Sequence, residues 1–172
     1  MNKKIKTFIN EEYKTIYDNL NVNWQKGFKN KLSELYSEGI INSGMSQIIL
    51  TNYAIELVKD INVKIKKLLI ESQEKFNFEM SCKDIEDYIN KSIDNSNDYL
   101  QKMQNDLLDY FDKKKMPLVE DCKMQLRNAK LNNKVDLNKI KNELILIKKG
   151  KNKEKRKTII KFIVEKILKF KK

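Results

Sequence analysis

The chain has 172 residues, with 36 basic and 24 acidic side chains, no histidine and a formal net charge of +12. This length suits one domain with a sizeable core, and four glycines and one proline leave little turn chemistry for a β-rich fold. No apolar run approaches the roughly 18 residues of a membrane span, and Glu11 and Glu12 come before any signal-peptide core develops. We therefore expect a helical, cytoplasmic protein.

The sequence lacks histidine and has no glycine-rich loop, two features on which common enzyme chemistry relies. Without histidine there is no imidazole base, no Ser–His or Cys–His nucleophile and no imidazole metal site. The isolated glycines form no phosphate-binding loop. Asp106, Asp109 and Asp112 could share a divalent ion, but an exposed acidic stripe on a helix has the same spacing. We predict the stripe, and therefore no metal site. Because histidine and a phosphate-binding loop are missing, we also predict a non-enzymatic protein with no cofactor or small-molecule substrate.

The two cysteines, Cys82 and Cys122, are far apart in sequence and match no metal-binding or redox motif. We predict that both are reduced thiols that pack as small core residues.

In chain order, apolar residues at steps of three and four predict helices over about 5–20 and 24–38, with a break in the asparagine-rich stretch 19–23. Gly39 is suited to end the second helix, because glycine accepts the left-handed conformation found just past helix ends. The linker from Gly39 to Gly44 ends in residues suited to capping the next helix. We expect the linker to form a buried corner; a binding loop is the alternative.

A hairpin of two long helices, about 43–78 and 81–115, is the centre of the predicted fold. Ser81, with Asp84 three residues later, has the spacing of a capping box at the start of the second helix. In the first helix, apolar residues recur at helical spacing: Met45, Ile49, Tyr53, Leu57, Val58, Ile61, Ile65, Leu68, Leu69 and Phe76.

Shorter helices are expected to pack against this hairpin. Pro117 suits the first turn of a helix that reaches about Ala129, and Asn132–Asn133 interrupts the pattern. Another helix is predicted from about 136 to 150, and a last one over about 158–170. The fold class is thus an elongated all-α bundle in a single domain, 1–172, with a sub-boundary near 116–117 as the alternative.

Nearly all of the net charge lies in the basic C-terminal segment, residues 148–172. This segment has 12 basic and two acidic residues, a balance of +10, whereas the preceding 147 residues carry +2 and residues 81–112 carry −5. Candidate contacts with an anionic partner are its basic residues Lys148, Lys149, Lys151, Lys153, Lys155, Arg156, Lys157, Lys161 and Lys169.

Three interpretations of this segment compete. Its apolar residues could dock the last helix into the bundle, or the helix could lie on an anionic membrane surface. In the third, its lysines bind the phosphates of nucleic acid. We favour docking for the apolar residues of the last helix and, among anionic partners of its basic residues, nucleic acid. The scarcity of arginine weighs against base-specific recognition. We therefore predict an interaction or scaffold protein with a basic end, and a coiled-coil homodimer through the long helices is a further possibility.

Overall fold

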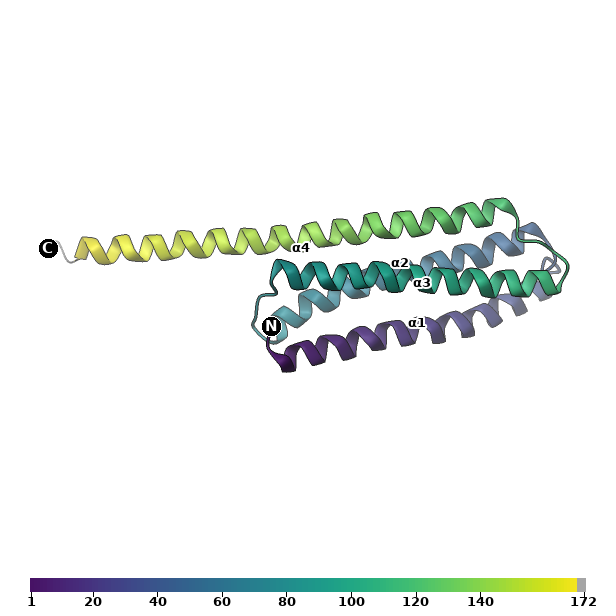
Figure 1. Cartoon of the computed structure of the whole chain (residues 1–172), viewed down its shortest axis with the longest axis horizontal. Coiled ribbons are helices and arrows are strands. Elements are labelled where there is room, and N and C mark those ends of the chain that lie inside the picture. Colours follow the sequence, from purple (N-terminus) through teal and green to yellow (C-terminus); the bar gives the residue numbers. More distant parts are fainter. Residues whose placement is uncertain (170–172) are drawn as a thin grey trace.

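The computed structural model describes the side chains of residues 1–150 and the backbone of the last helix as far as Lys169. Residues 1–169 form four helices: α1 (Lys3–Ser37), α2 (Gly44–Lys75), α3 (Cys82–Lys113) and α4 (Glu120–Lys169). They run alternately in opposite directions along one long axis, and α4 continues past the ends of the other three (Figure 1). The predicted all-α bundle is confirmed, and α2 and α3 have bounds close to those of the predicted hairpin.

Helix α1 is a single helix of 35 residues, so the predicted break in the stretch 19–23 is wrong. Two of the three asparagines there contact neighbouring helices, one through its side chain and one through its backbone. Lys102 of α3 donates a hydrogen bond to Asn21 Oδ1 at 2.7 Å, and the Tyr53 hydroxyl of α2 donates one to the Asn23 carbonyl at 3.0 Å. Contacts with two other helices thus outweigh the weak helix propensity of asparagine.

Helix α4 has 50 residues and replaces the three short helices that the sequence predicted after residue 116. Asn133 does not interrupt it; its side chain is 4% exposed and bonded to both Asn62 and Asn97. Gly150 does not end it either. The predicted last helix, about 158–170, is part of α4 as far as Lys169, and this part of the backbone projects beyond the bundle instead of folding back onto it (Figure 1).

The sequence predicted Pro117 in the first turn of a helix, and this is wrong. Pro117 lies in the linker before α4. Gln47 of α2 holds this linker with both ends of its amide. Its Nε2 donates to the Pro117 carbonyl at 3.2 Å, and its Oε1 accepts from the Val119 backbone N–H at 2.7 Å. Leu118 between them is buried. The linker is therefore fixed by a side chain from a distant part of the sequence, which local pattern cannot reveal.

The predicted caps are confirmed. The Ser43 hydroxyl accepts from the Ser46 backbone N–H at the start of α2. At the start of α3, Ser81 and Asp84 form the reciprocal capping box, with N···O distances of 3.0 and 3.2 Å. Gly39 adopts a φ of +72° just after α1. These residues end one helix and begin the next as their local chemistry predicts.

Buried apolar side chains run along the whole bundle. Ile61, Ile65 and Leu69 of α2 are at most 2% exposed, as predicted for the centre of its apolar face. Met45, at one end of that predicted face, is 56% exposed. The buried part of the face is therefore shorter than the run of apolar residues in the sequence. Cys122 is buried but Cys82 is exposed, and the prediction of two core thiols is wrong for Cys82.

The contact between α1 and α3 is made by long aromatic side chains that reach small polar ones. The Tyr13 hydroxyl donates to Ser92 Oγ at 3.2 Å, and the Tyr17 hydroxyl donates to the Ser92 carbonyl at 3.1 Å. Trp24 Nε1 donates to Asp106 Oδ2 at 2.7 Å. Serine on α3 leaves room for the tyrosine rings. The hydrogen bonds satisfy hydroxyl groups that would otherwise be buried without a partner.

Candidate functional site

The basic C-terminal segment, residues 148–172, begins where α4 leaves the bundle. Lys148 and Lys149 lie within the described side chains; Lys148 is half-buried and Lys149 is exposed. For the remaining predicted contacts the structure gives the helical backbone of α4 only. Their side chains lie outside the described residues: Lys151, Lys153, Lys155, Arg156, Lys157, Lys161 and Lys169.

Lys148 fastens α4 to the loop between α2 and α3. Its Nζ donates a hydrogen bond of 2.5 Å to the carbonyl of Met80, a residue that is fully buried. The Met80 backbone N–H is itself bonded to Gln73 Oε1 of α2 at 3.0 Å. Lys148 therefore anchors the helix at the bundle's edge and is poorly placed to bind a partner, whereas Lys149 is the first free cation of the segment within the described side chains.

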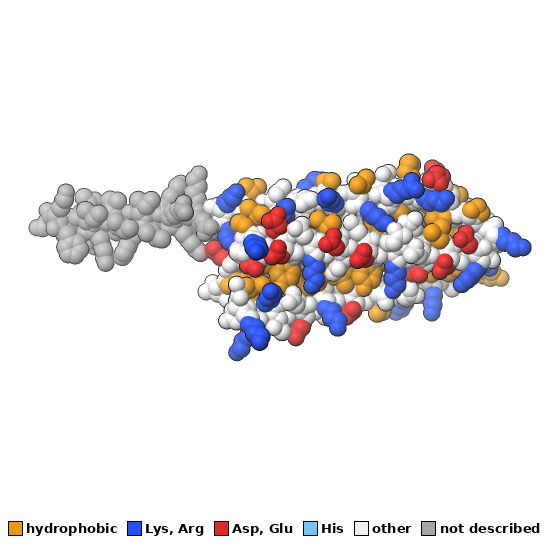
Figure 2. Space-filling model, viewed as in Figure 1, with side chains coloured by type: hydrophobic (Ala, Val, Ile, Leu, Met, Phe, Trp, Pro, Cys, Tyr) orange, Lys and Arg blue, Asp and Glu red, His pale blue; other side chains and the backbone are white. Residues whose placement is uncertain are grey.

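From Gly150 to Lys169 the backbone of α4 spans about 29 Å, at roughly 1.5 Å per residue. Figure 1 shows this part running on from the bundle with no other helix beside it. On the face of the bundle seen in Figure 2, basic and acidic side chains are mixed, in keeping with the charge of +2 over residues 1–147. Charge is thus balanced on the bundle and concentrated on the projecting helix.

The three aspartates near the end of α3 have different surroundings. Asp106 accepts hydrogen bonds from Trp24 and from Gln25 of α1, and so it helps to pack α1 against α3. Asp109 and Asp112 are exposed. Within the described residues no group of three or more carboxylate or thiol side chains is arranged to hold a metal ion.

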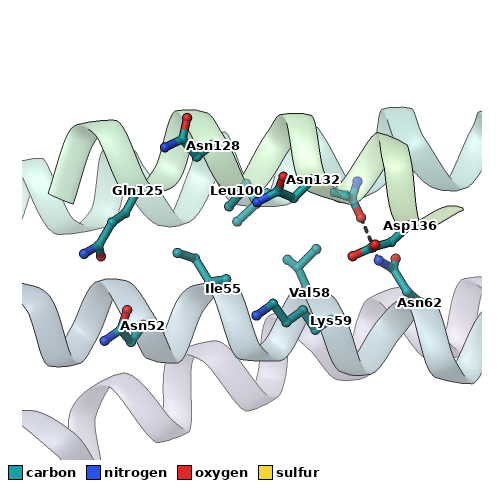
Figure 3. A pocket seen from close by; sticks show the side chains of 12 residues that line it. Asn52, Ile55, Val58, Lys59, Asn62, Leu100, Gln125, Asn128, Asn132 and Asp136 are labelled. Carbon is teal, nitrogen blue, oxygen red and sulfur yellow. Dashed lines mark hydrogen bonds between the residues drawn. The ribbon is translucent and has the colours of Figure 1, made fainter. Parts of the chain in front are cut away.

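A cavity of about 260 Å³ lies between α2 and α4, with Leu100 of α3 at its floor (Figure 3). Amide side chains such as Asn52, Asn62 and Asn132 line it, and the sequence analysis missed it. The one sequence feature that could have indicated the cavity is the recurrence of the amides Gln125, Asn128 and Asn132 at helical spacing on α4. The cavity could hold several water molecules, each of about 30 Å³.

Two buried amides that line the cavity, Asn62 and Asn133, belong to the packing of the bundle. Asn62 Nδ2 donates to Asn133 Oδ1 at 2.9 Å, and Asn133 Nδ2 donates to Asn97 Oδ1 at 3.3 Å. This relay joins α2, α4 and α3. Asn62 Oδ1 has no partner among the described residues, but it is also almost inaccessible from the cavity. The amides thus align the three helices, and the basic end of α4 remains the stronger candidate site.

None of the helices within the described residues is long and apolar enough to span a membrane. In the comparisons with known proteins, no family model, no curated protein and no solved structure matches this chain.

Proposed function

We propose that this chain is a non-enzymatic helical interaction protein whose basic C-terminal segment binds the phosphate backbone of nucleic acid. One observation carries the proposal: the backbone of α4 takes this segment beyond the other three helices (Figure 1). A helix outside the bundle can be approached from most directions, and residues 150–169 carry eight of the chain's 36 basic residues.

The charge distribution supports phosphate binding without base recognition. Binding of lysines to phosphates releases counterions from nucleic acid, which gives a favourable, salt-dependent free energy at any base sequence. Arginine, whose planar fork suits guanine, occurs only at Arg127 and Arg156. We therefore expect similar affinities for nucleic acids of different sequence.

An anionic membrane surface is a second candidate partner. Residues 159–168 combine Ile159, Ile160, Phe162, Ile163 and several further apolar residues with flanking lysines, a composition found in helices that lie on membranes. The projection of this part of α4 beyond the bundle supports this candidate too, since a membrane must reach the helix (Figure 1).

The two candidates can be separated by one pair of binding experiments. Fluorescence anisotropy would measure affinity for duplex DNA and for an RNA hairpin, and sedimentation would measure binding to vesicles containing phosphatidylserine. In the double variant Phe162→Asp and Ile163→Asp we expect nucleic-acid affinity to fall by less than tenfold, since the lysines remain. Loss of vesicle binding, in a protein that does not bind nucleic acid, would favour the membrane instead.

A further inference from the structure

Two buried oxygen atoms in the wall of the cavity between α2 and α4 have no hydrogen-bond partner among the described residues. They are Oδ1 of Asn62 on α2 and Oε1 of Gln125 on α4. The described side chains contain one other such atom, Thr51 Oγ1. Buried carbonyl oxygens in folded proteins are nearly always bonded, because an oxygen without a donor costs free energy. The cavity is therefore the part of the bundle where a donor from another molecule stabilises most.

Gln125 is the one of these two residues that can turn toward a ligand. Asn62 is held by its hydrogen bond to Asn133 at 2.9 Å. Gln125 makes no hydrogen bond within the described residues, and rotation about its side-chain bonds can bring its amide into the cavity. Figure 3 shows its side chain pointing from α4 toward Asn52 of α2. Gln125 is thus the contact that an entering ligand can recruit.

The rest of the lining combines an aliphatic floor with an amide rim. Val58 of α2 and Leu100 of α3 are buried, and Ile55 of α2 is half-buried beside them. The rim is exposed to solvent, so a ligand can enter from outside. It carries three amide side chains: Asn52, Asn128 and Asn132. Such a site suits a molecule with a flat apolar face and a hydrogen-bonding edge.

The lining carries no excess of either charge. It contains one lysine, Lys59, and one aspartate, Asp136. The Asp136 carboxylate is already paired with Lys139 at 3.6 Å. A phosphate or a polyamine in the cavity would leave most of its charge without a counter-charge, which is unfavourable. The lining therefore favours an uncharged ligand.

We propose that this cavity binds a purine, as the free base or the uncharged nucleoside. The faces of a purine are apolar and suit the aliphatic floor, while its edge carries donors and acceptors. Asparagine and glutamine pair with adenine through one donor and one acceptor, at its N7 atom and its N6 amino group. The cavity volume of about 260 Å³ lies just below the range of about 300–1,000 Å³ for drug-sized ligands, which suits a molecule of this size.

The proposal does not depend on nucleic-acid binding by the basic C-terminal segment. Apart from Leu100, the cavity is lined by residues between 52 and 62 and between 125 and 136, whereas that segment begins at Lys148. The purine is bound and not converted, in keeping with a non-enzymatic protein.

Calorimetric titration and thermal unfolding with adenosine test the binding. We expect saturable binding of one adenosine per chain, with a dissociation constant below about 1 mM, and a melting temperature that rises with adenosine concentration. D-Ribose, which has the sugar hydroxyls without the base, should not bind at the same concentrations. No saturable binding of adenosine up to about 5 mM, or equal affinities for adenosine and ribose, overturns the proposal.

Nuclear magnetic resonance locates the site. The side-chain amide signals of Asn128 and Asn132 should shift on addition of adenosine. Asn142 is an exposed asparagine of α4 outside the cavity, and its signals should stay in place. Shifts of equal size at all three residues indicate non-specific association and contradict the proposal.

The variant Gln125→Met removes the amide and keeps a side chain of similar length. We expect adenosine affinity to fall at least tenfold, while the melting temperature of the free protein stays the same or rises, because a buried oxygen without a donor is removed. A purely structural role of Gln125 would lower the melting temperature instead. Gln104→Met on α3 is the matched control, since Gln104 is also half-buried but does not line the cavity. If Gln125→Met and Gln104→Met bind adenosine equally well, the proposal is wrong.

Discussion

The hydroxyl of Tyr53 on α2 occupies the space beside Gly27 on α1 that any larger residue would need. A Cβ atom at position 27 would lie 1.8 Å from the Tyr53 hydroxyl oxygen and 2.4 Å from the ring carbon that bears it. The same hydroxyl donates to the Asn23 carbonyl, one turn earlier on α1, at 3.0 Å. Gly27 therefore lets the tyrosine lie against the α1 backbone and sets the closeness of α1 and α2 at this level.

The Gly27→Ala variant should be destabilised, although alanine normally favours a helix over glycine by about 1 kcal/mol. The clash must displace the Tyr53 ring, and we expect a net loss of about 1–3 kcal/mol. Gly150→Ala is the matched control, since a Cβ at that helical position meets no atom within 4 Å. It should leave stability unchanged or raise it. Urea unfolding of both variants measures this; equal stability of Gly27→Ala and its parent would refute the close contact.

Ile61→Asp should destabilise the fold severely. Ile61 is 2% exposed in the centre of α2, and an aspartate there would bury a charge among apolar side chains. We expect a loss of about 3 kcal/mol or more in thermal or urea unfolding. Val63→Asp, two residues along the same helix at an exposed position, should change stability by less than about 0.5 kcal/mol. If the two variants unfold alike, the assignment of the buried face is wrong.

The two cysteines should differ in reactivity. Cys82 is exposed, whereas Cys122 is buried and its burial raises the pKa of the thiol, which lowers the fraction of reactive thiolate. A thiol-specific reagent should therefore modify one equivalent quickly in the native protein and the second only on unfolding. Mass spectrometry of the labelled peptides identifies the site, and rapid labelling of Cys122 would contradict its position in the core.

Alkaline pH should destabilise the protein partly through Tyr17. Burial raises the pKa of Tyr17 above its usual value near 10. Its contribution to stability is therefore complete below about pH 10 and is lost as pH rises above that value, because the unfolded tyrosine ionises first. Tyr17→Phe should lower stability at neutral pH, since two hydrogen bonds are lost, but should reduce the slope of stability above pH 10. An unchanged slope would count against this linkage.

Local sequence chemistry predicted the ends of helices well. Ser81 with Asp84, and Gly39 after α1, act as their residue types suggest, because capping involves atoms only a few residues apart. The apolar spacing around Ile61 likewise predicted a buried helix face, since the period of an α-helix is fixed by its backbone.

Helix breaks were predicted poorly, because the residues involved are satisfied by distant partners. Asn133 looks like a helix breaker in the sequence, but it is bonded to Asn62 and Asn97 on two other helices. The linker at Pro117 is held by Gln47, 70 residues earlier. Hydrogen bonds of this kind override local propensity, and their partners lie 36 to 71 residues apart in the sequence, beyond the reach of local patterns.

The candidate site was predicted only in part. Charge counting located the basic segment, but it could not show that Lys148 is bonded to the Met80 carbonyl while Lys149 remains exposed. The continuity of α4 through Gly150 was also hidden, since glycine there reads as a stop. That continuity is what carries the basic segment away from the bundle.

The salt dependence of nucleic-acid binding tests the central claim most directly. In one variant, five basic residues of the projecting helix become glutamine: Lys151, Lys153, Lys155, Arg156 and Lys157. The control variant has the same change in charge at five exposed lysines of the bundle: Lys14, Lys26, Lys29, Lys64 and Lys83. Fluorescence anisotropy with duplex DNA over a range of salt concentrations gives the slope of log K against log salt for each protein. We predict that the first variant loses affinity and that its slope flattens by about 0.9 for each phosphate contact removed, while the control stays close to the parent. Equal affinities and equal slopes for the two variants would contradict the account.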